Sequence, residues 1–431
     1  MLTRGIRRWD LVLLTINSII GAGIFGLPSR IFALTGPYSI LSFIACAGIV
    51  LIFIFCFAEV SSRFQDTGGP YLYAKAAFGP FPGFLMGWLL MLSRVFIYAT
   101  LINLQVTYLE YFSPVFLTPM ARVFTICIVT ILLCWVNYRG IRNMTRLNSI
   151  LTIAKLLPLA IFIGLGLFHL EPARFETTAL PTAKDFSQSV LLLVFAFGGF
   201  ESVLVNTGEI HEPRKTLPFA LITATLFVAL CYILIQLVSI GTLPGLASST
   251  KPLADSARNF MGSGGATMIS AGAFVSILAT LNVLLLSGSR LPFALSLENQ
   301  LPSVFSGIHK RYHTPATSLV VMTLFTLAVS LAWTFLSALT ISVIIRVTIY
   351  MMVCLALLRL RRKEPGKKDY YQLKAGSVLA MMGLGISAWL YAAASWTEIR
   401  SALLFLILGV VVYFLYRTFS KAKSASTAAK Q

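Results

Sequence analysis

An apolar segment that interrupts itself with glycines is the feature that most constrains this chain. Residues 10–36 read DLVLLTINSII, then GAGIFG, then LPSRIFALTGP. A helix in lipid can leave backbone groups unpaired only where they face a cavity or a ligand. A second segment of this kind, VLLLVFAFGGFESVLVNTGE, occupies residues 190–209. Paired interruptions in corresponding places of two halves indicate the binding site of a secondary transporter.

The composition favours a membrane protein over a soluble domain. Of 431 residues, 57% are hydrophobic and 11% are charged, and the mean hydropathy is +0.84. A helix needs about 20 apolar residues to cross about 30 Å of hydrocarbon. Twelve such stretches begin near residues 10, 38, 83, 119, 149, 186, 218, 265, 315, 336, 376 and 398. We therefore predict an all-α membrane protein with 12 transmembrane helices, forming one integral domain over residues 1–431.

The distribution of lysine and arginine predicts the orientation in the membrane. With both termini inside, the cytoplasmic segments carry 24 of the 34 Lys and Arg, and the outer segments carry six. This bias follows the positive-inside rule, so we expect both termini in the cytoplasm. The expected location is the plasma membrane, or the inner membrane of a bacterium. The protein is expected to lie in the lipid bilayer, and the basic residues behind its net charge of +19 are spread over cytoplasmic loops and not gathered on one soluble face. We therefore expect no nucleic-acid partner.

Cysteine and histidine give no indication of a metal site. All six cysteines fall inside apolar stretches, where they behave as small hydrophobic residues. The four histidines fall in loops or at span ends, without metal-ligand spacing. We therefore expect no metal, no cofactor and no enzymatic activity.

The order of the interrupted segments predicts an internal repeat. They are the first and sixth spans, so the first ten spans form two blocks of five that begin alike and run in opposite directions. This predicts an inverted repeat over residues 10–169 and 186–360. Two additional helices are expected within 376–418, and the small polar tail 419–431 is predicted to be disordered.

Five motifs occur in order along the chain. They are GAGIFGLP at 21–28, AEVSSRFQDTGGPYLYAKAAFG at 58–79, FAFGGFES at 195–202, EIHEPRKTLP at 209–218 and SGSRLPFALSLENQLP at 287–302. With these motifs the chain resembles the amino acid, polyamine and organocation (APC) transporter superfamily over essentially its whole length. The resemblance implies a leucine-transporter-type (LeuT) fold with broken helices 1 and 6, and alternating access. It also implies a substrate site between spans one, three, six, eight and ten, with an amino acid or related amine as substrate.

The first interruption is suited to bind a carboxylate. A half-helix ending there exposes amide groups, and the helix dipole adds to the attraction. Small side chains let a ligand approach the backbone closely. We expect this substrate-binding role for Gly21, Ala22, Gly23 and Ile24. The alternative is a close crossing of two helices.

The second interruption is suited to bind the amino group of the same substrate. Unwound carbonyls are expected at Phe197, Gly198, Gly199 and Phe200. Phe195 resembles the position that closes over the ligand as an aromatic gate in relatives. The alternative for these phenylalanines is ordinary packing against lipid or core, since the chain has 32 of them.

Glu201 is an ionisable residue inside a span. Such residues are functional candidates because an unpaired charge in lipid is costly. Arg94 in span three and Arg346 in span ten lie at membrane depth, on spans that the implied fold places around the same cavity. We predict that at least one of them pairs with Glu201, either as part of a gate or as a purely structural ion pair.

Lys155, in LTIAKLLPLA of span five, is the candidate for ion coupling. It matches a position at which some APC relatives place an ammonium group where sodium-coupled relatives hold Na⁺. Burial disfavours the charged form of a lysine, so this residue could bind and release a proton during the cycle. The residue predicts proton-coupled, sodium-independent transport, with Ser276 or Thr280 as neighbours. The alternative is a lysine that snorkels to the cytoplasmic face.

Charged residues also cluster at the cytoplasmic ends of the spans. They predict an inner gate of salt bridges or, alternatively, simple anchoring at the interface, and they are Glu59, Arg63, Asp66, Glu209, Arg214 and Arg290.

Partners and transport mode are constrained less strongly. Light subunits of the heteromeric amino acid transporters carry a cysteine in the outer loop between spans three and four, where this chain reads YLEYFSPVFLTPM. We therefore expect no disulfide-linked heavy subunit. Alternatives to a symporter are an amino acid or polyamine exchanger and a transporter-like nutrient sensor or channel. Two arginines beside the single Glu201 weigh against a cationic substrate.

Overall fold

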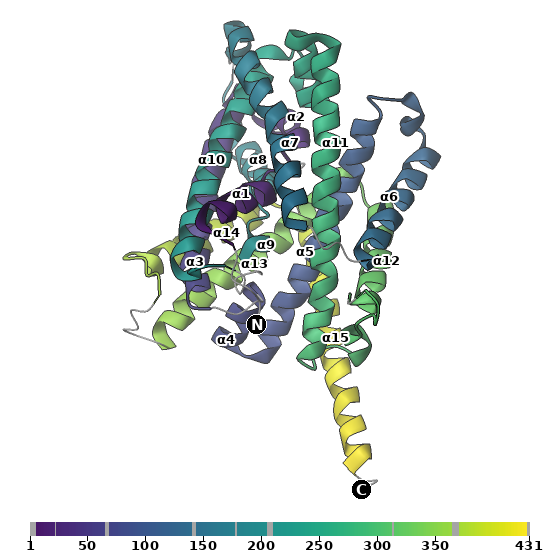
Figure 1. Cartoon of the computed structure of the whole chain (residues 1–431). Helices are drawn as coiled ribbons and strands as arrows, with labels where there is room; N and C mark the ends of the chain where they lie inside the picture. Colours follow the sequence, from purple (N-terminus) through teal and green to yellow (C-terminus); the bar gives the residue numbers. More distant parts are fainter. Residues whose placement is uncertain are drawn as a thin grey trace.

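Helices joined by short connections make up the described part of the chain. The computed structural model describes residues 6–21, 23–64, 69–139, 144–176, 179–204, 210–312, 314–363 and 370–428, without the side chains of 117, 144–154 and 419–428. In order, the α-helices (Figure 1) are α1 (Arg8–Ile19), α2 (Gly23–Thr35), α3 (Ser39–Ser62), α4 (Pro70–Phe78), α5 (Pro80–Leu109), α6 (Pro119–Arg139), α7 (Met144–Gly166), α8 (Ala183–Ala196), α9 (Glu201–Leu204), α10 (Pro213–Thr242), α11 (Pro252–Leu297), α12 (Ala316–Ala332), α13 (Phe335–Lys363), α14 (Gly376–Ala393) and α15 (Trp396–Ala428).

These helices confirm an all-α membrane protein. Within the described ranges, eight helical segments are long and apolar enough to cross a membrane, and two shorter apolar helices accompany them. Each of the twelve apolar stretches identified in the sequence is helical. Eleven of these helices begin within about five residues of the expected position, whereas α11 begins at Pro252 and not near residue 265. Long apolar runs fix helices well because every backbone group is satisfied within the helix.

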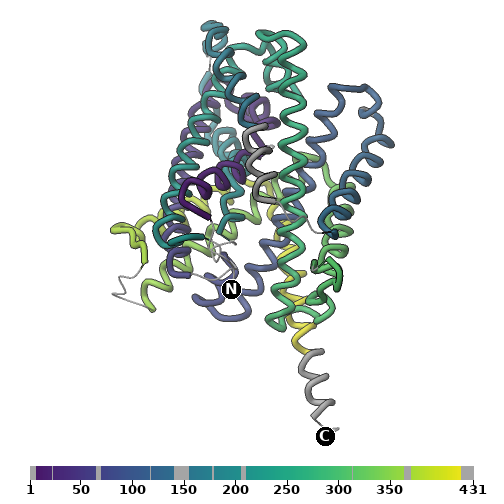
Figure 2. Tube along the Cα trace, viewed as in Figure 1, coloured from purple at the N-terminus to yellow at the C-terminus, as the bar shows by residue number. Residues whose placement is uncertain are grey.

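The bundle is arranged around α5. The apolar window of α5 is 94% buried, whereas those of α6 and α15 are 17% buried. The exposed residues of α6 include Phe124, Ile131 and Trp135, which is the surface expected of a helix that faces lipid. Figure 1 shows α6 beside α12 at one edge of the bundle, and α11 runs through almost its full height. The tube in Figure 2 follows the same path.

Two pairs of short helices stand where the interruptions were expected. α1 ends at Ile19 and α2 begins at Gly23, while α8 ends at Ala196 and α9 begins at Glu201. In Figure 1, α1 and α9 lie near mid-height of the bundle. Their ends therefore meet inside the protein, away from both of its ends.

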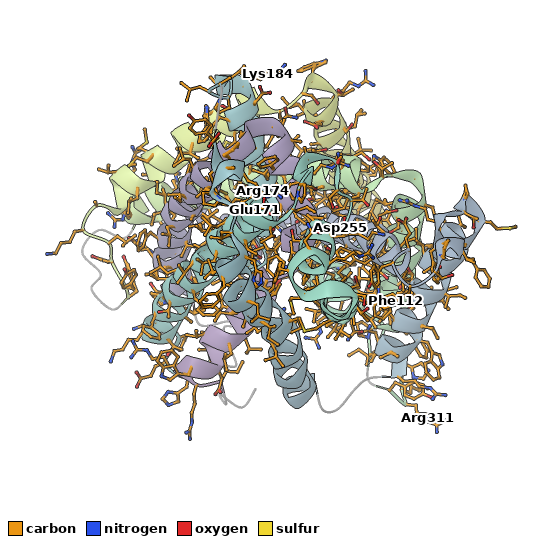
Figure 3. The ribbon with its side chains drawn as sticks, turned by 90° about the horizontal axis from the view of Figure 1, so that it is seen from above. Phe112, Glu171, Arg174, Lys184, Asp255 and Arg311 are labelled. Atoms are coloured by element: carbon orange, nitrogen blue, oxygen red, sulfur yellow. The ribbon has the colours of Figure 1, made fainter. Side chains whose placement is uncertain are left out.

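The connections at the upper end of the bundle carry polar residues. Seen from above in Figure 3, Glu171 and Arg174 lie side by side in the connection between α7 and α8, and they form an ion pair of 2.7 Å.

α11 bends at Gly262, which has φ 70° and ψ −164°, so a short helix precedes the long one. Glycine is the residue that adopts a positive φ without strain.

The last helix, α15, is assigned as far as Ala428. The expected disorder of the tail 419–431 stays a prediction.

Candidate functional site

A cavity of about 70 Å³ lies where the two interrupted helices meet. α5, α11 and α13 complete its wall. Eight of the residues singled out in the sequence line it, namely Gly21, Gly23, Arg94, Phe195, Gly198, Gly199, Thr280 and Arg346. Asn17, Ser18 and Ser202 also line it, and the sequence did not single them out.

Lys155 caps the carboxyl end of α1. Its Nζ donates hydrogen bonds to the carbonyl oxygens of Asn17 at 2.7 Å and Ile20 at 2.6 Å. The last carbonyls of a helix have no partner within the helix, and an ammonium group also interacts favourably with the helix dipole. Lys155 is only 2% exposed, which contradicts the alternative of a lysine that snorkels to the surface.

Ser276 and Thr280, the two residues expected beside Lys155, are not among its hydrogen-bond acceptors in the described structure. Thr280 donates within α11 to the carbonyl of Ser276 at 2.9 Å and lines the cavity. The Ser276 hydroxyl is buried without a hydrogen-bond partner in the described structure. A buried hydroxyl of this kind retains the capacity to bind a further group.

Arg346 caps the carboxyl end of α8 in a similar way. Its Nη1 donates to the carbonyl oxygens of Val194 at 3.2 Å and Phe195 at 3.1 Å. Its Nε lies 3.4 Å from Glu201 Oε1. The ion pair expected for Glu201 is therefore present, and Arg346 is the partner.

Glu201 holds the start of α9 in place. Its Oε2 accepts a hydrogen bond from the Gly199 amide at 2.8 Å, and its Oε1 accepts one from the Tyr350 hydroxyl at 2.5 Å. Both Glu201 and Tyr350 are buried. The carboxylate thus has an ion pair and two hydrogen bonds, as a buried charge requires.

Arg94 has a weaker set of partners. Its Nη1 donates to the Ser202 hydroxyl at 2.8 Å, and the residue is 6% exposed. Among the described residues, no carboxylate lies within 4 Å of its guanidinium group, as an ion pair would require.

Tyr232 of α10 connects both interruptions. Its hydroxyl donates to the carbonyls of Ile19 at 3.2 Å and Ala196 at 3.1 Å, the last residues of α1 and α8. Tyr232 was not singled out from the sequence. The available signal was a tyrosine inside an apolar span, because a buried phenol needs a hydrogen-bond partner.

Close packing explains why glycine stands at three positions. A Cβ on Gly23 would lie 2.9 Å from Ala196 Cα, and one on Gly198 would lie 1.4 Å from Arg346 Nη1. Gly199 has φ +117°, and a Cβ there would lie 2.1 Å from the Ser18 carbonyl. Gly21 differs, because its nearest neighbours would be 3.9 Å and 4.0 Å away.

Some expected substrate-binding residues lie elsewhere. Ile24, Phe197 and Phe200 are all described and buried, but they are not among the residues that line the cavity. Phe197 packs edge-on against Tyr232 at 5.2 Å between ring centroids, and Phe200 packs against Tyr350 at 5.6 Å. Ala22 lies outside the described residues.

The expected cluster of inner charges centres on Glu59. This carboxylate is fully buried and forms ion pairs with Arg361 at 2.6 Å and with Arg63 at 3.3 Å. Arg361 was not expected as a partner. Arg214 and Arg290 are exposed, and Asp66 and Glu209 lie outside the described residues.

The helical bundle, its apolar exterior and its internal polar cavity define a multi-pass membrane transport protein. The sequence matches the Amino acid permease family over residues 6–428, and the chain belongs to this family of the APC superfamily. It is therefore a transporter and not an enzyme.

Three curated relatives come from Bacillus subtilis (strain 168). The chain is 27% identical to the Methylthioribose transporter, covering 96% of this chain and 94% of the relative. It is 25% identical to the Branched-chain amino acid permease BcaP, covering 96% and 93%. It is 28% identical to the Serine/threonine exchanger SteT, covering 96% of both chains.

Proposed function

We propose that this permease moves amino acids across the plasma membrane by alternating access, with the cavity between the two interruptions as its substrate site. The proposed architecture is a LeuT-type 5+5 inverted repeat of twelve spans. In it α1 with α2 forms the first span, and α8 with α9 forms the sixth. Both termini lie in the cytoplasm, in keeping with the excess of lysine and arginine in the inner segments.

The substrate carboxylate binds at the start of α2. The first amides of a helix lack partners within it and attract anions. Gly21 and Gly23 line the cavity, and the room beside Gly21 supports this position. The amino group binds near Gly198 and Gly199, and Phe195, which lines the cavity, closes over the ligand.

The hydrogen bonds of Lys155 carry the proposal for ion coupling. Its ammonium group lies on the carbonyls of Asn17 and Ile20, at distances of 2.7 and 2.6 Å. These oxygens are hard ligands of the kind that bind a metal cation, so the lysine replaces a sodium ion. Release of its proton would free the end of α1, and transport is therefore proton-coupled and sodium-independent.

Exchange is the second candidate, because one relative bears the name Serine/threonine exchanger. Uptake into reconstituted vesicles tests the two modes. We expect an inward proton gradient to drive accumulation of an amino acid equally well in sodium and choline buffers. A requirement for sodium would overturn the coupling, and uptake only in vesicles preloaded with amino acid would assign exchange. A conductance without saturation would support a channel instead.

A further inference from the structure

The buried charges around the cavity do not balance. Arg94, Lys155 and Arg346 are 6%, 2% and 4% exposed, and Glu201 is 5% exposed. Glu59 is the other buried charged residue of the described chain, and it is paired with Arg63 and Arg361. Among the residues that the structure describes, the cavity region therefore has three buried cations and one buried anion. The excess stays positive even when Lys155 releases its proton.

Among the described residues around the cavity, Arg94 is the cation without a hydrogen bond or ion pair to a carboxylate or backbone carbonyl, although Glu201 acts on it electrostatically at longer range. Arg346 lies beside Glu201, and Lys155 donates to two backbone carbonyls. Arg94 donates to the neutral hydroxyl of Ser202, and in the described structure no carboxylate is within ion-pair distance. A guanidinium group has five N–H donors, and a buried cation without a counter-ion is costly. Since Arg94 lines the cavity, a ligand can supply the missing anion.

An ordinary zwitterionic amino acid does not balance these charges. Its carboxylate and its ammonium group cancel, and the proposed position of its carboxylate is the start of α2. A second carboxylate on the side chain would meet Arg94, and a guanidinium group can bind it through two parallel hydrogen bonds. A basic side chain would bring a like charge toward two arginines.

We infer that the substrate is an acidic amino acid whose side-chain carboxylate binds Arg94. This inference rests on the proposed function and adds the substrate class and a specificity-determining residue. It makes Ser202 a positioning residue, since its hydroxyl holds one arm of the guanidinium group.

A comparison of matched ligands, each added separately to the unmodified protein, tests the inference. Aspartate and glutamate are compared with asparagine and glutamine, and with succinate and glutarate, which lack the amino group, by thermal stabilisation of the purified permease. We expect the acidic amino acids to bind at least about tenfold more tightly than either set, as a charge-assisted hydrogen bond allows. Equal or tighter binding of the amides would overturn the inference and leave the proposed function standing. Equal binding of succinate and glutarate would show that the amino group is not recognised, and it would overturn the inference that the substrate is an amino acid. Failure to bind any amino acid would overturn the proposed function as well.

Variants of Arg94 separate a specificity role from a structural one. For Arg94→Met we expect the affinity for aspartate or glutamate to fall at least about tenfold, with a change below about threefold for the amides. Arg94→Lys retains the charge but loses the paired donors, so it should recover part of the preference. Arg122→Met is the matched control, since Arg122 is bonded to the Asn103 side chain and does not line the cavity. An equal loss for both ligand classes in Arg94→Met and Arg94→Lys would assign a structural role and overturn the inference.

Discussion

Lys155 and Arg346 occupy equivalent places relative to the helix ends that they cap. Lys155 lies in α7 and Arg346 lies in α13. Each donates to a carbonyl two residues before the last residue of a helix, Asn17 in α1 and Val194 in α8. The proposed inverted repeat would place these two caps at corresponding positions of its halves. The two caps differ in one respect, because an arginine stays charged whereas a buried lysine can lose its proton.

Replacing Lys155 should uncouple transport from protons. Lys155→Ala leaves the carbonyls of Asn17 and Ile20 without their donor, at a cost of about 1–3 kcal/mol for each buried group. We expect a lower unfolding temperature and loss of proton-driven accumulation. Lys155→Arg should keep the cap and fold normally, but it should no longer respond to a proton gradient. Vesicle uptake with an imposed pH difference measures both effects, and full proton coupling in Lys155→Ala would refute the role of this residue.

The ion pair of Glu201 with Arg346 should be energetically coupled. A double-mutant cycle of Glu201→Gln and Arg346→Met is expected to give an interaction free energy of about 1–3 kcal/mol, because each single change leaves a buried partner unpaired. Thermal or denaturant unfolding in detergent supplies the four free energies.

The exposed pair of Lys75 with Glu298 is the control for this cycle. Its atoms are 2.7 Å apart, and its side chains are 34% and 46% exposed. We expect a coupling below about 1 kcal/mol for Lys75→Met with Glu298→Gln. If the buried pair couples no more strongly than this one, the assigned ion pair does not contribute to stability.

Alanine substitutions of the glycines should have graded effects. A Cβ at Gly198 would displace the Arg346 guanidinium group, and one at Gly23 would lie 2.9 Å from the Ala196 backbone, so we expect transport to be lost and the unfolding temperature to fall in both variants. Gly21→Ala has room and should fold normally while weakening ligand binding. Gly48→Ala meets nothing within 4 Å and serves as the control. Normal transport by Gly198→Ala would exclude the described arrangement of the second interruption.

The contact between the ends of α3 and α13 that carry Glu59 and Arg361 should depend on two hydrogen-bond donors. Arg361 donates to Glu59 from Nε at 2.7 Å and from Nη2 at 2.6 Å. Arg361→Lys removes the paired geometry, and we expect it to lower the free energy of unfolding by about 2 kcal/mol. Its exposed neighbour Arg362 gives the matched substitution Arg362→Lys, which should change stability by less than about 0.5 kcal/mol. Equal effects of the two changes would argue against a contribution of this contact.

The sequence predicted the helices, because long apolar runs are local signals, and described helices also end close to both glycine clusters. It also indicated Glu201, Arg94, Arg346 and Lys155, since a charge in an apolar span stands out. It did not identify the acceptors of Lys155, which are backbone carbonyls and not the Ser276 or Thr280 side chains. Backbone acceptors are present at every residue, so only the packing of helices selects them.

The contacts that the sequence could not predict join residues far apart in the chain. Arg361 and Glu59 are separated by 302 positions, and several other arginines are closer to Glu59 in the sequence. Tyr232 joins α1 to α8 through carbonyls at two distant helix ends. The rings of Phe197 and Phe200 pack against tyrosines in the core, and the expected role of their backbone carbonyls stays a prediction.

Counterflow in sodium-free vesicles tests the central claim most directly, namely that the two facing helix ends form the substrate site of a carrier. Vesicles are loaded with unlabelled amino acid and diluted into a trace of the labelled one, for the wild type, Gly198→Ala and Gly48→Ala. We expect saturable, transient accumulation of label in the wild type and in Gly48→Ala, and none in Gly198→Ala. Flux that does not saturate, or accumulation that is unchanged in Gly198→Ala, would contradict it.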